Sequence, residues 1–98
     1  MNEITRDPTA GLNGAVAAEL RAERAAKEIS FEAIADRVSM SYRTLLRLFS
    51  AERFITIEAL VEIAAALGVS VLEIVERAEK RVVKDAPPPP AEGGATTP

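Results

Sequence analysis

The sequence predicts an all-α fold, a compact bundle of five helices with no strand. Three observations support it. Apolar residues recur at helical spacing in five stretches of the 98-residue chain. Ser, Thr or Asn, the residues that favour helix N-termini, stand at the start of each stretch. The connections between the stretches are short, which favours a helical domain over a mixed architecture.

The first predicted helix runs from Asn13, its expected N-cap, to about Lys27. Leu12, Val16 and Leu20 form its apolar spine, at the four-residue spacing that places side chains on one side of a helix. We therefore expect this helix to bury that spine against the rest of the bundle.

The stretch FEAIADRVSMSYRTLLRLF predicts two short helices joined by a tight turn. Ser30 is the expected cap of a helix over residues 31–38, and Ser41 that of a helix over residues 41–50. Between them, Ser39-Met40-Ser41 interrupts the apolar pattern. This arrangement indicates a helix-turn-helix.

The second of these helices has two contrasting sides. At about 100° per residue, Leu45, Leu48 and Phe49 fall on one side. Arg43 and Arg47 fall on the opposite side. A small helix that is held from behind and presents two guanidinium groups outward suits the major groove of double-stranded DNA.

Two further helices follow. Thr56 is the expected cap of a helix over residues 57–67, which is apolar on most sides and therefore predicted to be buried. Gly68 suits the position after its end. Ser70 and Glu73 form a capping-box pattern that opens a last helix, ending near residue 83. The predicted apolar stripe of this last helix is Leu72, Val75, Ala78 and Val82.

The domain boundaries follow from composition. Residues 1–11 lack periodicity and predict a flexible N-terminal arm, residues 12–84 form the folded domain, and residues 85–98 predict a disordered Pro/Gly-rich tail. The four consecutive prolines favour polyproline II. A solubilising role for the tail and a proline-recognising partner are both open.

Composition excludes several functions. The chain has no Cys and no His, so the commonest metal ligands and general base are missing. There is no phosphate-cradling glycine loop and no convergent acid pair, so we expect neither an enzyme nor a cofactor. No apolar run approaches a membrane span, and the N-terminus has no signal pattern. A cytoplasmic protein is the expectation.

The charge is unevenly distributed. The net charge is −3, yet the window from Arg37 to Arg53 contains four arginines and one acid, Glu52. Outside this window acids gather, among other places, in the last two predicted helices, at Glu58, Glu62, Glu73, Glu76 and Glu79. A local basic surface on an acidic body fits a DNA-binding protein with low non-specific affinity, although a plain solvated helix face is the alternative.

The region from about Leu20 to Val75 resembles the Cro/C1-type (XRE-like) helix-turn-helix family of phage and bacterial repressors. The segments LRAERAAKEISFEAIA and ALVEIAAALGVSVLEIV are similar to its first-to-second and fourth-to-fifth helices. Ala35 is the most specific match, because two helices cross closely at that position. The resemblance implies a lambda-repressor-like DNA-binding domain. The six matching motif positions are Ile34, Ala35, Val38, Met40, Leu45 and Leu48.

Some positions depart from the family pattern. Ser39 stands at a frequent turn Gly, and a left-handed backbone there costs about 1 kcal/mol. Phe31 replaces a frequent Gln, so its polar contact is lost or replaced by packing. Phe49 replaces a frequent Glu, which leaves Arg24 in need of another carboxylate. In the following loop, Ala51 and Ile55 replace the usual Gly and Pro.

The resemblance implies base contacts from Tyr42, Arg43 and Arg47, with Thr44 beside them. An arginine matches guanine O6 and N7 with two donors, although phosphate contact or pairing with a surface acid is the alternative. Ser39 and Ser41 lie near helix N-termini that face phosphates. The predicted DNA-binding residues are Ser39, Ser41, Tyr42, Arg43, Thr44, Arg47 and Arg53.

Other residues near this site have two interpretations. Arg37 contacts phosphate or offsets a helix dipole. Leu46 lies between the two sides of its helix and meets either a thymine methyl or a partner subunit. The competing function is an antitoxin-like or adaptor module that binds another protein.

The resemblance also implies dimers on near-palindromic sites, and we expect a homodimer that is weak without DNA. Either the last helix, through Leu72, Val75 and Val82, or the loop around Phe54 and Ile55 is expected to supply the interface. Closing the hydrophobic core is the alternative role of the last helix.

Overall fold

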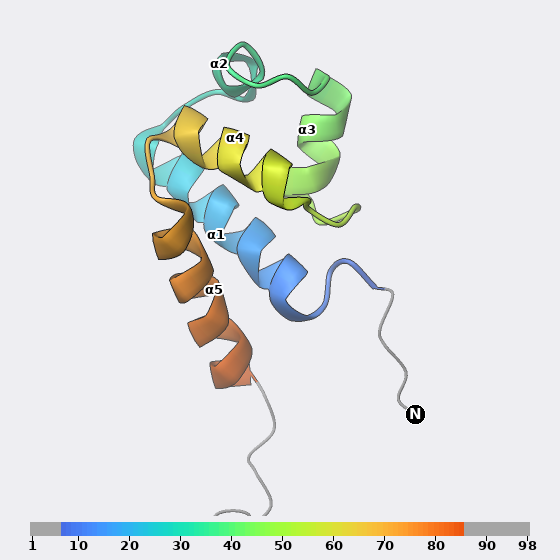
Figure 1. The fold of residues 1–98 in the computed structure, drawn as a ribbon, viewed down its shortest axis with the longest axis vertical. Helices are drawn as coiled ribbons and strands as arrows, with labels where there is room; N and C mark the ends of the chain where they lie inside the picture. The colour runs from blue at the N-terminus through green and yellow to red at the C-terminus, as the bar shows by residue number, and fades with distance from the viewer. Residues whose placement is uncertain (1–6, 86–98) are drawn as a thin grey trace, which may run out of the picture.

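A computed structural model describes residues 7–85, and this part of the chain is helical without any strand (Figure 1). The all-α prediction is confirmed. The predicted tail, apart from Asp85, and most of the predicted N-terminal arm lie outside the described residues. The five helices within residues 7–85 are α1 (Gly11–Lys27), α2 (Phe31–Ala35), α3 (Tyr42–Phe49), α4 (Ile57–Leu67) and α5 (Val71–Asp85).

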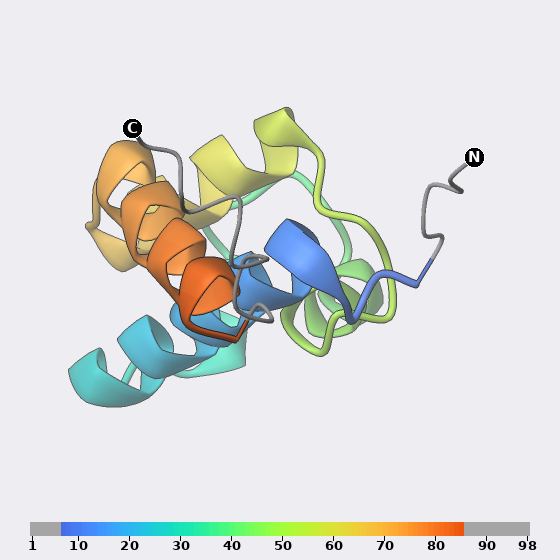
Figure 2. The same ribbon diagram turned by 90° about the horizontal axis from the view of Figure 1, so that it is seen from below.

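Helix α1 is the centre of the bundle. It packs against α3, α4 and α5, and its longest contact is with α5. Figure 2 shows α5 on one side of α1, with α3 and the loop after it on the other. The helix-turn-helix, α2 and α3, therefore sits at one end of the molecule, supported by α1 and α4. The largest fully buried side chains are Phe49, Leu20, Ile34, Leu45, Ile63, Leu67 and Ile74.

The start of α1 differs from the prediction that Asn13 caps it. The helix begins two residues earlier, at Gly11, and no side chain caps it. The Asn13 amide instead donates to the Pro8 carbonyl at 2.6 Å and to the Arg53 carbonyl at 3.2 Å. Its oxygen accepts from the Ile55 amide at 2.8 Å. Asn13 thus ties the α3–α4 loop to α1, a long-range role that local spacing does not reveal.

Helix α2 is shorter than predicted, ending at Ala35 and not near residue 38. The Arg37 amide donates to the Ile34 carbonyl at 2.9 Å, which tightens the last turn. Two residues later, the Ser39 amide donates to a Glu62 carboxylate oxygen at 2.6 Å. The Ser39 amide is thus bonded to α4 and adds no further turn to α2.

The C-terminal end of α4 is held by side chains from outside the helix. Gly68 has φ 73°, as its predicted place after the helix requires. The Lys27 ammonium donates to the Leu67 carbonyl at 2.8 Å. The Arg37 guanidinium donates to the Ala66 carbonyl at 2.9 Å. Of the two roles expected for Arg37, the structure shows the contact with a helix dipole, although the helix is α4 and not its own.

The capping residues of α4 and α5 are as predicted, but the buried stripes differ. Ile57 is 76% exposed, so α4 is not buried on all sides. On α5, Ala78 is fully buried as predicted, but Leu72 is 79% exposed and Ile74, which was not in the predicted stripe, is fully buried. Leu72 and Ile74 are two residues apart, about 200° around the helix, so both cannot face the core.

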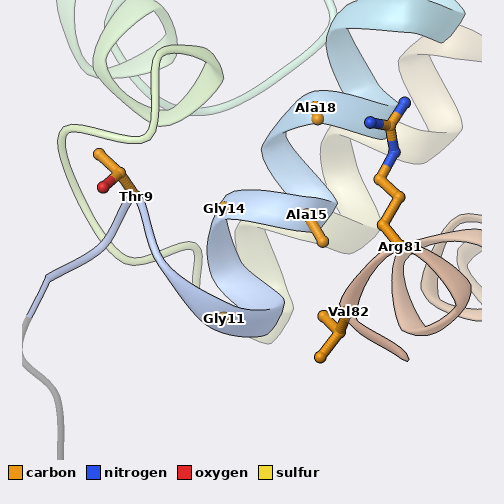
Figure 3. Close-up of a pocket in the computed structure, with 7 residues that line it drawn as sticks. All are labelled: Thr9, Gly11, Gly14, Ala15, Ala18, Arg81 and Val82. Atoms are coloured by element: carbon orange, nitrogen blue, oxygen red, sulfur yellow. The ribbon is translucent and has the colours of Figure 1, made fainter. Parts of the chain in front are cut away.

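Ion pairs join α1 to α5. Arg77 donates to Glu23 at 3.0 Å, and Glu23 also pairs with Lys27 at 3.1 Å. Arg81 pairs with Glu19, and Figure 3 shows its side chain extending from α5 toward α1. Acid and base on this side of the molecule thus neutralise each other. The pocket beside this pair is lined by Thr9, Gly11, Gly14, Ala15, Ala18, Arg81 and Val82 (Figure 3).

Within residues 7–85, no helix combines the length and the hydrophobicity needed to cross a bilayer.

Candidate nucleic-acid interface

Helix α3 is fixed at its start and along one side. The Ser41 hydroxyl accepts from the Thr44 amide at 3.1 Å, which confirms the predicted cap. Leu45, Leu48 and Phe49 are buried, which confirms the predicted core side. The opposite side of α3 faces solvent. These contacts leave the helix N-terminus and the outer side as its free surfaces.

The two outward arginines of α3 differ in their contacts. Arg43 is exposed and has no hydrogen bond or ion pair within the described residues. Arg47 pairs with Glu52 at 3.5 Å across the turn that ends the helix. Both side chains are exposed in this pair, at 45% and 61%. Of the two arginines, Arg47 therefore pairs with a surface acid, as one of the alternatives expected, and Arg43 does not.

The N-terminal turn of α3 carries three hydroxyl groups. The Ser41 hydroxyl bonds the Thr44 hydroxyl at 3.1 Å, so the cap also positions this half-buried Thr. Tyr42 is 43% exposed and lies at the first position of the helix. The positive end of the helix dipole and these hydroxyls form a surface suited to an anion such as a phosphate.

Ser39 is already engaged by α4. Its amide and its hydroxyl both bond the Glu62 carboxylate, with hydroxyl distances of 3.0 and 2.8 Å. These bonds from the Ser39 amide and hydroxyl lower the pKa of Glu62, so this group stays ionised. A phosphate would have to displace a carboxylate to bond Ser39. Its backbone is not left-handed, so the strain considered for the missing Gly does not arise there.

A left-handed residue does occur in the loop after α3. Ala51 has φ 62° and is buried, at a position where the family favours Gly. Arg53, two residues on, is exposed, and its guanidinium has no partner within the part of the chain described. Its backbone is held by Asn13, as described above. The α3–α4 loop therefore exposes the Arg53 guanidinium, while hydrogen bonds to Asn13 hold the backbone of the loop in place.

An aromatic cluster replaces the polar contacts expected around Arg24. The Arg24 guanidinium lies over the Phe31 ring, 4.4 Å from its centroid, and donates to the Ile29 carbonyl at 2.8 Å. Phe31 and Phe49 meet edge to face at 5.1 Å. The expectation that Arg24 needs a carboxylate was wrong, because a cation–π contact takes its place. Phe31 and Phe49, the two aromatic residues that depart from the family pattern, thus pack against each other.

Arg21 is a site residue that sequence reasoning missed. Its guanidinium donates to the Phe49 carbonyl at the end of α3, at 2.7 Å. It lines one groove together with Phe31 and the outer side of α3. No sequence signal identifies it, because it lies on α1, some 28 residues before its partner. This groove is lined by Arg21, Phe31, Arg43, Leu46, Arg47, Phe49, Ser50 and Glu52.

The seven predicted DNA-binding residues lie on two separate surfaces of the structure. Five of the predicted residues lie at the start or on the outer side of α3: Ser41, Tyr42, Arg43, Thr44 and Arg47. Ser39 and Arg53 line a second groove, beside Glu58 and Glu62 of α4. The outer side of α3 is therefore the more cationic of the two surfaces.

Comparison with known proteins identifies the family. Residues 15–79, more than half of the chain, match a family model described as a helix-turn-helix domain. A crystal structure of the clp gene regulator ClgR from C. glutamicum is similar, with 28% identity and a TM-score of 0.68. The match covers 74% of this chain and 94% of that chain. A search of curated proteins gives no match. The chain belongs to the XRE-like helix-turn-helix family.

Proposed function

We propose that this protein is a sequence-specific, double-stranded DNA-binding transcriptional regulator that acts as a repressor, with α3 in the major groove. The family match and the similarity to a gene regulator support the general role. The observation that carries the finer proposal is the outer side of α3. There Arg43 is exposed and, within the described residues, unpartnered on a helix held from behind by its buried side chains.

Each part of this surface has a proposed role. Arg43 and Arg47 contact base edges, preferably guanine O6 and N7. Arg47 does so at the cost of its exposed pair with Glu52. Tyr42, with the N-terminal amides of α3, and Arg53 in the loop contact phosphates and set the register of the helix in the groove.

A homodimer on a two-fold site is part of this proposal. The loop and the last helix, the two expected sources of an interface, meet in one groove that contains no charged residue. Phe54 and Ile57 at this groove are 53% and 76% exposed. A self-complementary apolar patch suits an isologous contact, weak in solution and strengthened when DNA holds two copies side by side. The groove is lined by Leu12, Asn13, Val16, Phe54, Ile55, Ile57, Leu60 and Val75.

Selection of bound duplexes from a random pool tests the proposal. We expect enrichment of a near-palindrome whose half-sites are about one helical turn apart. Arg43→Ala and Arg47→Ala should each weaken binding to the selected duplex by about 10- to 100-fold, and to a scrambled duplex far less. Equal losses on both duplexes would reduce the arginines to phosphate contacts.

Two controls complete this test. Lys80→Ala removes an exposed cation on α5, far from α3 in the chain, and should leave binding unchanged. A titration at several salt concentrations counts the phosphate contacts. If no duplex is enriched over the starting pool, the DNA-binding proposal is wrong, and an antitoxin-like or adaptor module, using the uncharged groove for a protein partner, replaces it.

A further inference from the structure

One apolar residue that the core does not require lies at the border between the buried and the outer side of α3. Leu46 is half-buried, while Leu45, Leu48 and Phe49 supply the packing of α3 against the bundle. Leu46 follows Arg43 by three residues and precedes Arg47 by one. At about 100° per residue, Leu46 lies about 60° from Arg43 and about 100° from Arg47 around the helix, so it borders the side that carries the two arginines.

Leu46 lies in a groove of mixed character. The Phe31 ring, which is half-buried against Arg24 and Phe49, lines the groove together with Leu46. Guanidinium groups border it: Arg21 from α1, and Arg43 and Arg47 from α3. The single acid that lines it, Glu52, is paired with Arg47. The groove is thus apolar in part and cationic at its borders.

We propose that Leu46, which lines the same groove as Phe31, is a specificity-determining residue that contacts the 5-methyl group of a thymine. The inference rests on the proposed function and names a base feature that this surface recognises. The occupant must be an anion to match the bordering arginines, and it must carry a small apolar group to match Leu46. In the DNA major groove, the thymine methyl is the apolar group that projects from a base edge.

The arrangement also explains how the two kinds of contact would cooperate. Arginines bind guanine or phosphate through charge and hydrogen bonds, but neither contact distinguishes thymine from cytosine. A methyl group that reaches Leu46 leaves water on binding and contributes through apolar burial. The preferred half-site therefore contains a thymine close to a guanine.

Replacement of thymine by deoxyuridine tests this inference, since it deletes the methyl group and retains the base pair. Each thymine of a duplex selected by the wild-type protein is replaced in turn. We expect one position per half-site at which deoxyuridine weakens wild-type binding by about fourfold, the effect of one buried methyl. Leu46→Ala should bind the thymine and deoxyuridine duplexes equally. Val83→Ala, at an exposed apolar residue of α5, should retain the wild-type difference.

The outcomes separate this inference from the proposed function. If deoxyuridine changes the affinity at no thymine of the selected duplex, the proposed Leu46 contact is wrong. The proposed DNA binding would stand in that case, because the duplex is still bound. The Leu46 contact is equally overturned if Leu46→Ala keeps the full deoxyuridine penalty. If a 5-methylcytosine–guanine pair at the sensitive position binds more tightly than a cytosine–guanine pair there, the methyl group itself is the feature that is recognised. Because Leu46 lies outside the core, Leu46→Ala should unfold at the wild-type temperature.

Discussion

The two ends of the molecule use arginine in different ways. Between α1 and α5, Arg77 and Arg81 pair with Glu23 and Glu19. Around α3, Arg43 has no partner among residues 7–85, and Arg47 has one exposed pair. Arg77 and Arg81 thus join two helices, whereas Arg43 and Arg47 face solvent on the outer side of α3. This difference shows why the net charge of −3 says little about nucleic-acid binding here.

The forces that hold the two regions also differ. The α1–α5 contact combines ion pairs with small and branched apolar side chains, including Ile74 and Ala78. The α2–α3 unit depends on Phe31 and Phe49, which meet edge to face, and on Arg24, whose guanidinium lies over the Phe31 ring. Partly exposed ion pairs contribute little to stability, whereas buried aromatic rings contribute much. Aromatic packing is therefore the main support of the helix that we propose contacts DNA.

Removal of that aromatic support should have the greatest consequence for stability. Phe49→Ala should lower the free energy of unfolding by about 3–5 kcal/mol, because a ring that is 2% exposed is replaced by a cavity. Urea denaturation measures the loss. Arg77→Ala, which deletes ion pairs of the other region, should shift the midpoint far less. A similar shift for both variants would mean that ion pairs hold the α1–α5 region more strongly than their exposure implies.

Glu52→Gln examines the exposed pair of Arg47. Loss of the carboxylate releases the guanidinium and removes a negative charge near the proposed DNA surface. We expect DNA affinity to rise about two- to fivefold at low salt, the range of an exposed ion pair, and less at high salt. Glu76→Gln, at an exposed acid of α5, makes the same change in net charge and is the matched control. Equal gains for both variants would indicate a general charge effect.

A weaker effect, a pH dependence, is expected in the α1–α5 region. Hydrogen bonds from Lys27 and then Arg77 lower the pKa of Glu23 below 4.5. A lowered folded-state pKa stabilises the protein above the unfolded-state value, and this contribution is lost as pH falls through the folded pKa. Glu23→Gln should therefore flatten stability against pH in the acid range, by less than about 1 kcal/mol. Glu79→Gln is the control, and an unchanged acid slope in Glu23→Gln would contradict the assignment.

Local signals in the sequence were sufficient for the fold. Helix caps at Ser30, Ser41 and Thr56 depend on a hydroxyl a few residues from its donor, so they are visible in the sequence. The buried side of α3 was likewise confirmed, since its period is local. The length of α2 was predicted wrongly, and the Ser39 amide that follows it bonds Glu62, 23 residues away, which local spacing does not show.

The candidate site was predictable only in part, for the same reason. The outward position of Arg43 follows from helical period, and the structure bears it out. The partners of Arg24 and Asn13 were predicted wrongly, because they depend on packing that local spacing does not show. Arg37 does offset a helix dipole, but that of α4, 29 residues away in the chain. Which arginines stay free is therefore a property of the fold.

The division of arginines between the two regions is tested most directly by measuring both DNA affinity and unfolding for Arg43→Ala and Arg77→Ala. Each variant removes one arginine, so the net charge is identical. We predict that Arg43→Ala binds the selected duplex about 10- to 100-fold more weakly at unchanged stability. Arg77→Ala should bind normally and unfold slightly earlier. Equal affinities for the two variants, or a loss of stability confined to Arg43→Ala, would contradict this division.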